Sequence, residues 1–366
     1  MYKLYQTATL PSADRSIQEK RIALIDDDPI FRCITSEYLK AQGYLVHEAN
    51  DGLEGLRVIR DVSPELVICD LSMPVMDGIE LVAEISLEYP SLPVIVVSAT
   101  DEMSDVAQAL KFGIKDFLPK PISNFGNLGK AIESTLHDAD NYLCDQRDFS
   151  SQWFRIDSGD MPEDQELHWH LEYLQNNPNA AKDLLHALLP EKDTAQGQWK
   201  CAYRLLQSTD TMPLIFDYAW LMNGQFIFYL VDSQNETNNG VAATLLVRAL
   251  FNDYLRNLKS FNADLKDIAE LLENGMSCMA SADPVRSLFG LADLSEGTLD
   301  ILPAGLQAQW AGSGKNKHIF AGNLLGSQSL KNAVVKDLPI HESCKLTMSR
   351  LGSSSFSFDI YRNRIT

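Results

Sequence analysis

One stretch decides the fold of the N-terminal third of the chain: Leu-Val-Ile-Cys-Asp-Leu-Ser-Met-Pro at 66–74, in which four apolar residues lead into Asp70. Three further short apolar runs, at 22–25, 94–97 and 117–118, also lead into polar side chains. Runs of this length and composition indicate parallel strands that are buried on both faces. Because open α/β sheets place their ligand sites at the carboxyl ends of strands, we expect Asp70 to lie in such a site.

The polar residues that follow the other three runs have matching chemistry. Asp26 and Asp27 follow the first run, Ser98 follows the second, and Lys120 follows the last. Mg²⁺ prefers oxygen ligands and takes a few carboxylates together with waters and phosphate oxygens, so Asp26, Asp27 and Asp70 are candidate ligands. The Ser98 hydroxyl and the Lys120 ammonium would hold phosphoryl oxygens by positioning and electrostatic stabilisation. A single aspartate after a strand is more often a helix N-cap, but the whole ordered series favours a phosphate-accepting site.

These residues resemble the receiver domain of two-component response regulators over 20–137. The motifs that carry the resemblance are Ile-Asp-Asp-Asp-Pro at 25–29, Asp-Leu-Ser-Met-Pro at 70–74 and Leu-Pro-Lys-Pro at 118–121. The resemblance implies that a histidine kinase or a small phosphodonor phosphorylates Asp70.

The same resemblance assigns the remaining site residues. It implies that Asp26 and Asp27 complete a Mg²⁺ site with Asp70, and that Ser98 and Phe117 occupy the switch positions that respond to phosphorylation. Phe117 lacks the hydroxyl of a tyrosine, so its ring can report burial but not a new hydrogen bond. The alternative for Phe117 is an ordinary core phenylalanine.

Composition bounds the class of protein. A length of 366 residues predicts two or three domains, and a net charge of −19 argues against nucleic acid as a partner. No apolar run approaches the ~20 residues that cross a bilayer, and no signal-peptide pattern is evident. Six cysteines without a C-x-x-C pair indicate buried free thiols in a reducing compartment, so we expect a cytoplasmic protein with no membrane partner.

The pattern along the chain predicts an α/β protein in four parts. We expect a leader at 1–19, a CheY-like doubly wound (βα)5 receiver at 20–137, a linker at 138–178 with a signalling helix at 163–175, and an α+β sandwich at 179–366.

Within the C-terminal part the sequence predicts two helices and several strands. Asn223-Gly224 between two apolar runs is a strong hairpin signal, and Gly240 opens a long amphipathic segment. The predicted elements are helices at 180–189 and 240–258, a hairpin of strands at 214–221 and 225–231, further strands at 275–325 with a turn at 296–297, and two strands within 345–361.

The region from 185 resembles a PP2C-type, SpoIIE-like serine/threonine phosphatase domain, a family that holds two bridged metal ions with several aspartates. Asp217 and Asp232 match two of these aspartates, whereas Leu214 and Leu351 stand where the family has others. Two carboxylates cannot readily hold two divalent ions. We interpret Asp217 and Asp232 as residual and inactive phosphatase positions, and a remaining single metal site is the alternative.

The chain as a whole resembles the family of response-regulator adaptors that deliver the stress sigma factor σS to the ClpXP protease. The stretches that support this are 177–185, 239–252 and 304–306. The resemblance implies a pseudo-phosphatase adaptor that catalyses only its own aspartyl phosphorylation, with σS, ClpXP and anti-adaptor proteins as partners.

The main alternative function is a receiver-controlled PP2C-type phosphatase that acts on an anti-sigma antagonist. The count of metal carboxylates separates the two hypotheses and favours the adaptor. A transcription factor is not supported, because the acidic chain offers no basic recognition helix. Cyclic-dinucleotide enzymes are disfavoured because the sequence contains neither GGDEF nor EAL.

Overall fold

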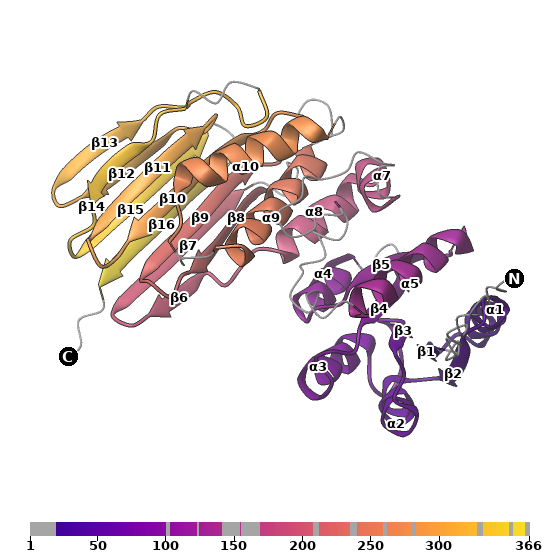
Figure 1. Ribbon diagram of the computed structural model, residues 1–366. Coiled ribbons are helices and arrows are strands. Elements are labelled where there is room, and N and C mark those ends of the chain that lie inside the picture. Colours follow the sequence, from indigo (N-terminus) through magenta and orange to yellow (C-terminus); the bar gives the residue numbers. More distant parts are fainter. Residues whose placement is uncertain are drawn as a thin grey trace, which may run out of the picture.

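The computed structural model shows a small parallel sheet with helices, followed by two stacked antiparallel sheets with helices along one side (Figure 1). Its chain runs from indigo at the parallel sheet to yellow in the stacked sheets. The residues that the structure describes are 20–99, 103–122, 124–140, 154, 169–207, 212–234, 240–258, 262–279, 283–327, 332–350 and 354–362.

The parallel sheet has the strand order β2-β1-β3-β4-β5, and every neighbouring pair is parallel. This is the doubly wound arrangement that the apolar runs predict, so the predicted fold of the N-terminal part is confirmed. The strands are β1 (Arg21–Ile25), β2 (Leu45–Ala49), β3 (Leu66–Cys69), β4 (Val94–Ala99) and β5 (Asp116–Lys120).

Helices cover both faces of this sheet, because successive strand residues point to opposite sides. In β1, Ile22 and Leu24 pack with α1 and α5, whereas Ala23 and Ile25 pack with α2, α3 and α4. The helices are α1 (Pro29–Ala41), α2 (Gly52–Val62), α3 (Gly78–Glu88), α4 (Met103–Lys111) and α5 (Phe125–Asp140).

Three of these helices begin at an aspartate that follows a strand or loop. The carboxylates of Asp28, Asp51 and Asp77 accept hydrogen bonds from backbone N–H groups in the first turns of α1, α2 and α3. Each cap satisfies one N–H that has no partner inside the helix. The three consecutive aspartates 26–28 therefore have two roles. Asp28 caps α1, while Asp26 and Asp27 remain available for the predicted phosphate-accepting site.

Two short helices, α7 (Trp169–Asn176) and α8 (Pro178–Ala187), connect the parallel sheet to the sandwich. In the sandwich, one sheet has the order β14-β11-β10-β9-β8 and the other has the order β13-β12-β15-β16-β7-β6. The first sheet is formed by β8 (Leu214–Trp220), β9 (Gln225–Asp232), β10 (Arg286–Asp293), β11 (Thr298–Ala304) and β14 (Val335–Pro339). The second is formed by β6 (Asp193–Gln196), β7 (Trp199–Gln207), β12 (Ala308–Gly312), β13 (Lys315–Ile319), β15 (Ser343–Arg350) and β16 (Ser354–Arg362).

An aromatic core joins the two sheets. The ring centroids of Phe216 and Phe356 lie 5.0 Å apart, and those of Phe228 and Phe358 lie 4.8 Å apart, in tilted arrangements that suit aromatic quadrupoles. Gly290 leaves room for this packing, because a Cβ atom there would lie 2.1 Å from the Phe228 ring. The helices α9 (Gly240–Arg256) and α10 (Leu265–Cys278) cover the other face of the five-stranded sheet.

The structure confirms the predicted hairpin, which is β8 and β9, and the predicted helices, which are α8 and α9. It corrects the expectation of strands from residue 275, because α10 continues to Cys278 with apolar residues at helical spacing. The sequence did not predict β6, β7 or β14. The leader at 1–19, the start of the predicted signalling helix at 163–168, and Leu351 lie outside the described residues.

The aromatic core makes a testable prediction for stability. Phe216 is fully buried against five aromatic rings, so Phe216→Ala should lower the free energy of unfolding by about 3–5 kcal/mol. Urea unfolding of the full chain measures this. The control Phe320→Ala removes a ring that is 76% exposed and should change the unfolding free energy by less than about 0.5 kcal/mol. Equal effects of the two variants would contradict the assignment of the core.

Candidate functional site

The candidate site lies at the carboxyl ends of β1 and β3, where the chain connections leave toward opposite faces of the sheet. Asp26 follows β1, and Asp70 follows β3 with its backbone N–H donating to Ile25 O at 2.9 Å. Such a reversal of strand order is where doubly wound sheets form their ligand sites. Gly78 completes the site's wall: a Cβ atom there would lie 2.0 Å from the carbonyl oxygen of Asp70, so α3 can begin this close only with glycine.

The side chain of Lys120 joins the two buried aspartates. Its Nζ lies 2.7 Å from Asp26 Oδ2 and 2.5 Å from Asp70 Oδ2. Lys120 ends β5, two strands away from Asp70, and the Nζ atom also lies 4.6 Å from the centroid of the Phe31 ring. The structure thus brings together three of the residues that the sequence analysis selected.

The electrostatics of this cluster show a shortage of positive charge. Burial raises the pKa of Asp70 and of Asp26, and the Lys120 ammonium offsets only part of that rise. Burial lowers the pKa of Lys120, but its hydrogen bonds and ion pairs with the two aspartates outweigh this and raise it overall. Two buried carboxylates therefore share one ammonium, and a further cation would stabilise their charged forms.

The donor atoms suit a hard divalent cation. Carboxylate oxygens of Asp26, Asp27 and Asp70 all lie within 4.8 Å of one another, the one such group of acidic, histidine or cysteine ligands among the described residues. Asp70 Oδ1 accepts a hydrogen bond from Leu71 N at 2.7 Å, which fixes the carboxylate's orientation. An all-oxygen set with one exposed member, Asp27, fits the way in which Mg²⁺ keeps several water ligands.

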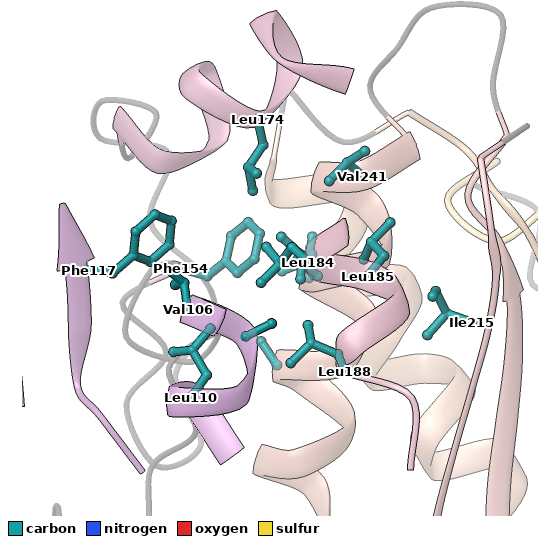
Figure 2. Packing of buried hydrophobic residues seen from close by; sticks show 14 of the residues in the cluster. Val106, Leu110, Phe117, Phe154, Leu174, Leu184, Leu185, Leu188, Ile215 and Val241 are labelled. Carbon is teal, nitrogen blue, oxygen red and sulfur yellow. The ribbon is translucent and has the colours of Figure 1, made fainter. Parts of the chain in front are cut away.

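The two predicted switch residues lie on neighbouring strands but in different surroundings. Ser98 is buried near the end of β4 and pairs in register with Pro119, the residue before Lys120. Phe117, in β5, is 1% exposed. Figure 2 shows its ring beside that of Phe154, within the apolar cluster that includes α8. Phe117 is thus buried in a core shared with the C-terminal part of the chain, a position that both the switch role and the ordinary core role predict.

This shared core connects the parallel sheet to the sandwich. Val106 and Leu110 on α4 face Leu184 and Leu188 on α8 in Figure 2, and all four are buried. At the edge of the contact, Lys111 Nζ donates a hydrogen bond to Leu189 O at 3.3 Å. The contact buries the side of α4 that carries Val106 and Leu110.

Sequence reasoning missed Phe154, whose ring is 2% exposed and lies at the centre of this contact. It stands in the polar connector at 138–160, which matches no motif. The available signal was the pair Trp153-Phe154 in an otherwise polar stretch, because an aromatic residue there has little reason to face water.

The two residual phosphatase positions are not brought together. Asp217 pairs in register with Tyr229, which faces the helices, whereas Asp232 pairs with Leu214, which faces the other sheet. The two carboxylates therefore lie on opposite faces of the five-stranded sheet.

Each of these carboxylates has an arginine partner. Arg248 of α9 forms an ion pair with Asp217, and Arg286 Nη1 lies 3.8 Å from Asp232 Oδ2. Leu214, which stands where the phosphatase family has an aspartate, is buried in the aromatic core between the sheets. This geometry gives Asp217 and Asp232 no common ion to hold.

Among the described residues, no helix is long and apolar enough to cross a membrane.

Comparisons with known proteins agree with this geometry. Residues 22–133 match the family model of the response regulator receiver domain. The "Regulator of RpoS" of Escherichia coli (strain K12) is 31% identical over 255 residues, which is 69% of this chain and 71% of that protein. The "Transcriptional regulatory protein GlrR" of the same organism is 39% identical over 115 residues, 31% of this chain and 26% of that protein.

Several solved structures resemble about a third of this chain. A response regulator receiver domain protein from Methanospirillum hungatei JF-1 is 27% identical, with a TM-score of 0.33, and covers 34% of this chain and 98% of that chain. The response regulator protein TrrA from Thermotoga maritima, solved in complex with Mg(2+)-BeF, is 27% identical with a TM-score of 0.30 and covers 32% and 98%.

The cluster predicts which residue accepts a phosphoryl group. Incubation of the chain with acetyl phosphate and Mg²⁺ should add one phosphoryl group to the wild type and none to Asp70→Asn, as measured by intact mass. Chelation of Mg²⁺ should abolish the gain, because one ammonium cannot offset the repulsion between the carboxylates and the donor. The control Asp61→Asn changes an exposed aspartate of α2 and should react as the wild type does. An equal gain of mass in Asp70→Asn would show that another residue accepts the phosphoryl group.

Proposed function

This chain belongs to the Regulator of RpoS family, and from that premise we propose that it acts as a phosphorylation-controlled adaptor. In this proposal it is a two-component response regulator that binds the stress sigma factor σS, which is RpoS, and delivers it to the ClpXP protease. A histidine kinase or a small phosphodonor phosphorylates Asp70, and anti-adaptor proteins oppose the delivery of σS. We place these steps in the cytoplasm.

One observation carries the proposal: an unbroken apolar core runs from Phe117 through Phe154 to Leu184. A receiver that regulates an output domain needs a physical connection between its phosphorylation site and that domain. Here Phe117 lies three residues before Lys120 on the same strand, and Lys120 contacts Asp70 directly. A change at the carboxylate therefore has a short route into the contact between α4 and α8.

Phosphorylation would redistribute the ion pairs at the site. It replaces the Asp70 carboxylate with a group that carries close to two negative charges and several strong acceptor oxygens. We propose that Lys120 and Ser98 hold these oxygens and that Lys120 thereby loses part of its pairing with Asp26. Mg²⁺, held by Asp26, Asp27 and Asp70, would supply the positive charge that lets the donor approach.

In this proposal the C-terminal domain responds because the interface between α4 and α8 can adopt two packings. Side chains of α4 and α8 pack as in a protein core, where alternative arrangements are discrete rather than continuous. A preference of about 1–3 kcal/mol for one packing after phosphorylation gives a clear but graded response. The signalling element in this proposal is the α4–α8 contact, with α7 next to α8 along the chain.

The C-terminal domain supports a binding role rather than catalysis. Asp217 and Asp232 lie on opposite faces of one sheet and are paired with Arg248 and Arg286. A PP2C-type reaction needs two metal ions side by side. A domain that keeps its packing without a metal centre is best suited to hold another protein.

The adaptor proposal and the phosphatase alternative differ in whether the chain hydrolyses phosphoserine, and the adaptor proposal predicts that it does not. The full chain should not hydrolyse a phosphoserine peptide in Mn²⁺ above the rate of buffer, because Asp217 and Asp232 lie on opposite faces of one sheet and cannot hold bridged ions together. A phosphate-release assay measures this, with an active PP2C-type phosphatase as the positive control. Turnover that disappears in Asp232→Asn would overturn the pseudo-phosphatase proposal and favour a phosphatase acting on an anti-sigma antagonist.

The adaptor proposal predicts a gain in proteolysis. With ClpXP and ATP, the phosphorylated chain should accelerate the loss of σS without being consumed, and Asp70→Ala should accelerate it less. Gel densitometry of σS and of the chain follows both quantities, and Asp61→Asn serves as the matched control. An unchanged rate of σS loss with the phosphorylated wild type would refute the adaptor function.

A further inference from the structure

The aromatic ring of Phe31 lies against the cation of the candidate site. The Nζ atom of Lys120 lies 4.6 Å from the centroid of this ring, in addition to its contacts with Asp26 and Asp70. An ammonium at this distance over an aromatic face is attracted by the negative face of the ring quadrupole. Of these three contacts of the ammonium, the one with Phe31 is the contact that involves no formal negative charge.

The start of α1 fixes the place of this ring. Asp28 caps the helix, with its Oδ1 atom accepting a hydrogen bond from Ile30 N at 2.8 Å. Pro29 stands at the first helical position, where its fixed φ suits the helix. The ring of Phe31 is half-buried and packs against the apolar cluster between the sheet, α1 and α5. The acidic stretch that supplies Asp26 to the site therefore also begins the helix that holds the ring.

The same helical turn offers a second apolar side chain, which faces elsewhere. Ile30 is 69% exposed, whereas Phe31 is half-buried beside the ammonium. The turn thus presents its aromatic residue, rather than its aliphatic one, to Lys120. An aliphatic side chain at the place of Phe31 would cover the lysine stem equally well but would not attract its charge.

Lys120 needs such a neighbour because its side chain is flexible. A lysine ammonium is a strongly hydrated point charge on a four-carbon stem with many rotamers. The Lys120 side chain is 20% exposed, so water is available to its ammonium as an alternative environment. A ring held in place by the core favours the rotamers in which the ammonium stays over the site.

The proposed reaction changes the ion pairs of Lys120 but not its contact with the ring. An oxygen of the Asp70 carboxylate forms a bond to phosphorus, and the bond between phosphorus and the leaving group breaks with its electron pair on the leaving group. The ammonium then exchanges part of its contact with Asp70 for phosphoryl oxygens. Asp26 attracts the same ammonium and so competes with those oxygens. The ring attracts it without an ion pair, so this contact can persist throughout.

We propose that Phe31 is a positioning residue for the phosphorylation of Asp70, because its aromatic face holds the Lys120 ammonium over the site as the phosphoryl group arrives. The inference rests on the proposed function for the reaction itself, and on the place of the ring for the role. An ammonium that is already confined to the site loses less freedom when it binds the phosphoryl oxygens, and this lowers the barrier to transfer.

The alternative role for Phe31 is ordinary packing of α1 on the sheet. The two roles depend on different properties of the side chain. Packing depends on the size and the apolar character of the ring, whereas attraction of a cation depends on the electron density of its face. Fluorine atoms on the ring withdraw that electron density with little change in size, so fluorinated rings separate the two roles.

The experiment replaces Phe31 in the full chain by phenylalanines that carry one, two or three ring fluorines. The rate constant of phosphorylation by acetyl phosphate in saturating Mg²⁺ is measured by intact mass. It should fall with each added fluorine, to roughly a third of the wild-type value with three, as the loss of a cation–π contact predicts. Phe31→Tyr should stay within about twofold of the wild type because it keeps an electron-rich face, and Phe31→Leu should fall at least as far as the ring with three fluorines.

Phe125 of α5 provides the matched control. It is half-buried against the same apolar cluster, and its ring packs against that of Tyr38 with the centroids 5.1 Å apart. The same three fluorinated residues at Phe125 should leave the rate constant of phosphorylation at the wild-type value. A fall of equal size in the two series would report a general effect of fluorination on packing and would overturn the positioning role.

The remaining outcomes separate this inference from the proposed function. A rate constant that does not change with fluorination at Phe31, in a chain whose wild type gains the phosphoryl group, overturns the role of Phe31 and leaves the phosphorylation of Asp70 intact. A wild-type chain that gains no mass, or a gain that persists in Asp70→Asn, overturns the proposed reaction and the inference with it. Urea unfolding of each variant accompanies the kinetics, and a fall in rate that follows the unfolding free energy instead of the number of fluorines also overturns the inference.

Discussion

The ammonium of Lys120 is the interaction on which the N-terminal site depends. It lies within 2.7 Å of carboxylate oxygens of both Asp26 and Asp70, and burial raises the pKa values of both aspartates. One cation between two buried anions links the carboxyl ends of β1, β3 and β5, yet leaves the cluster short of positive charge. A site balanced in this way is stable enough to stay folded and responsive enough to change when charge is added, which is the property that a phosphorylation switch requires.

The same strand that carries Lys120 carries Phe117, and this places the electrostatic site and the apolar interface on one rigid element. Phe117 contributes to the core that contains Phe154 and Leu184, so the apolar packing of the receiver continues into the C-terminal part of the chain. Packed cores transmit displacement because they have few voids to absorb it. In the proposed function, the short distance along β5 is the route by which a change in one ion pair would reach the packing of the second domain.

The sequence predicted the parallel sheet and selected the residues that lie together at its edge, since these buried strands lead into residues whose chemistry is recognisable by itself. It failed where the information lies in packing between distant segments. Gly275 reads as a helix breaker, but a Cβ atom there would lie 2.3 Å from Leu250 Cδ1, so the glycine allows α9 and α10 to pack closely. Phe154 gave little signal because its partners are remote in sequence. The hairpin was predicted, but its register, which sends Asp217 and Asp232 to opposite faces, depends on how the loop at 221–224 closes.

The two pairs of aspartates differ in how far their negative charge is compensated by neighbouring cations. Asp26 and Asp70 share a single lysine, so their charge is only partly compensated and a divalent cation or a phosphoryl group can change the balance. Asp217 and Asp232 each have an arginine of their own, and a guanidinium stays charged at any physiological pH. These ion pairs add contacts between β8 and α9 and between β9 and β10. The two domains therefore differ in charge balance: in the receiver two buried carboxylates share one ammonium, whereas each of the two aspartates of the sandwich has an arginine partner.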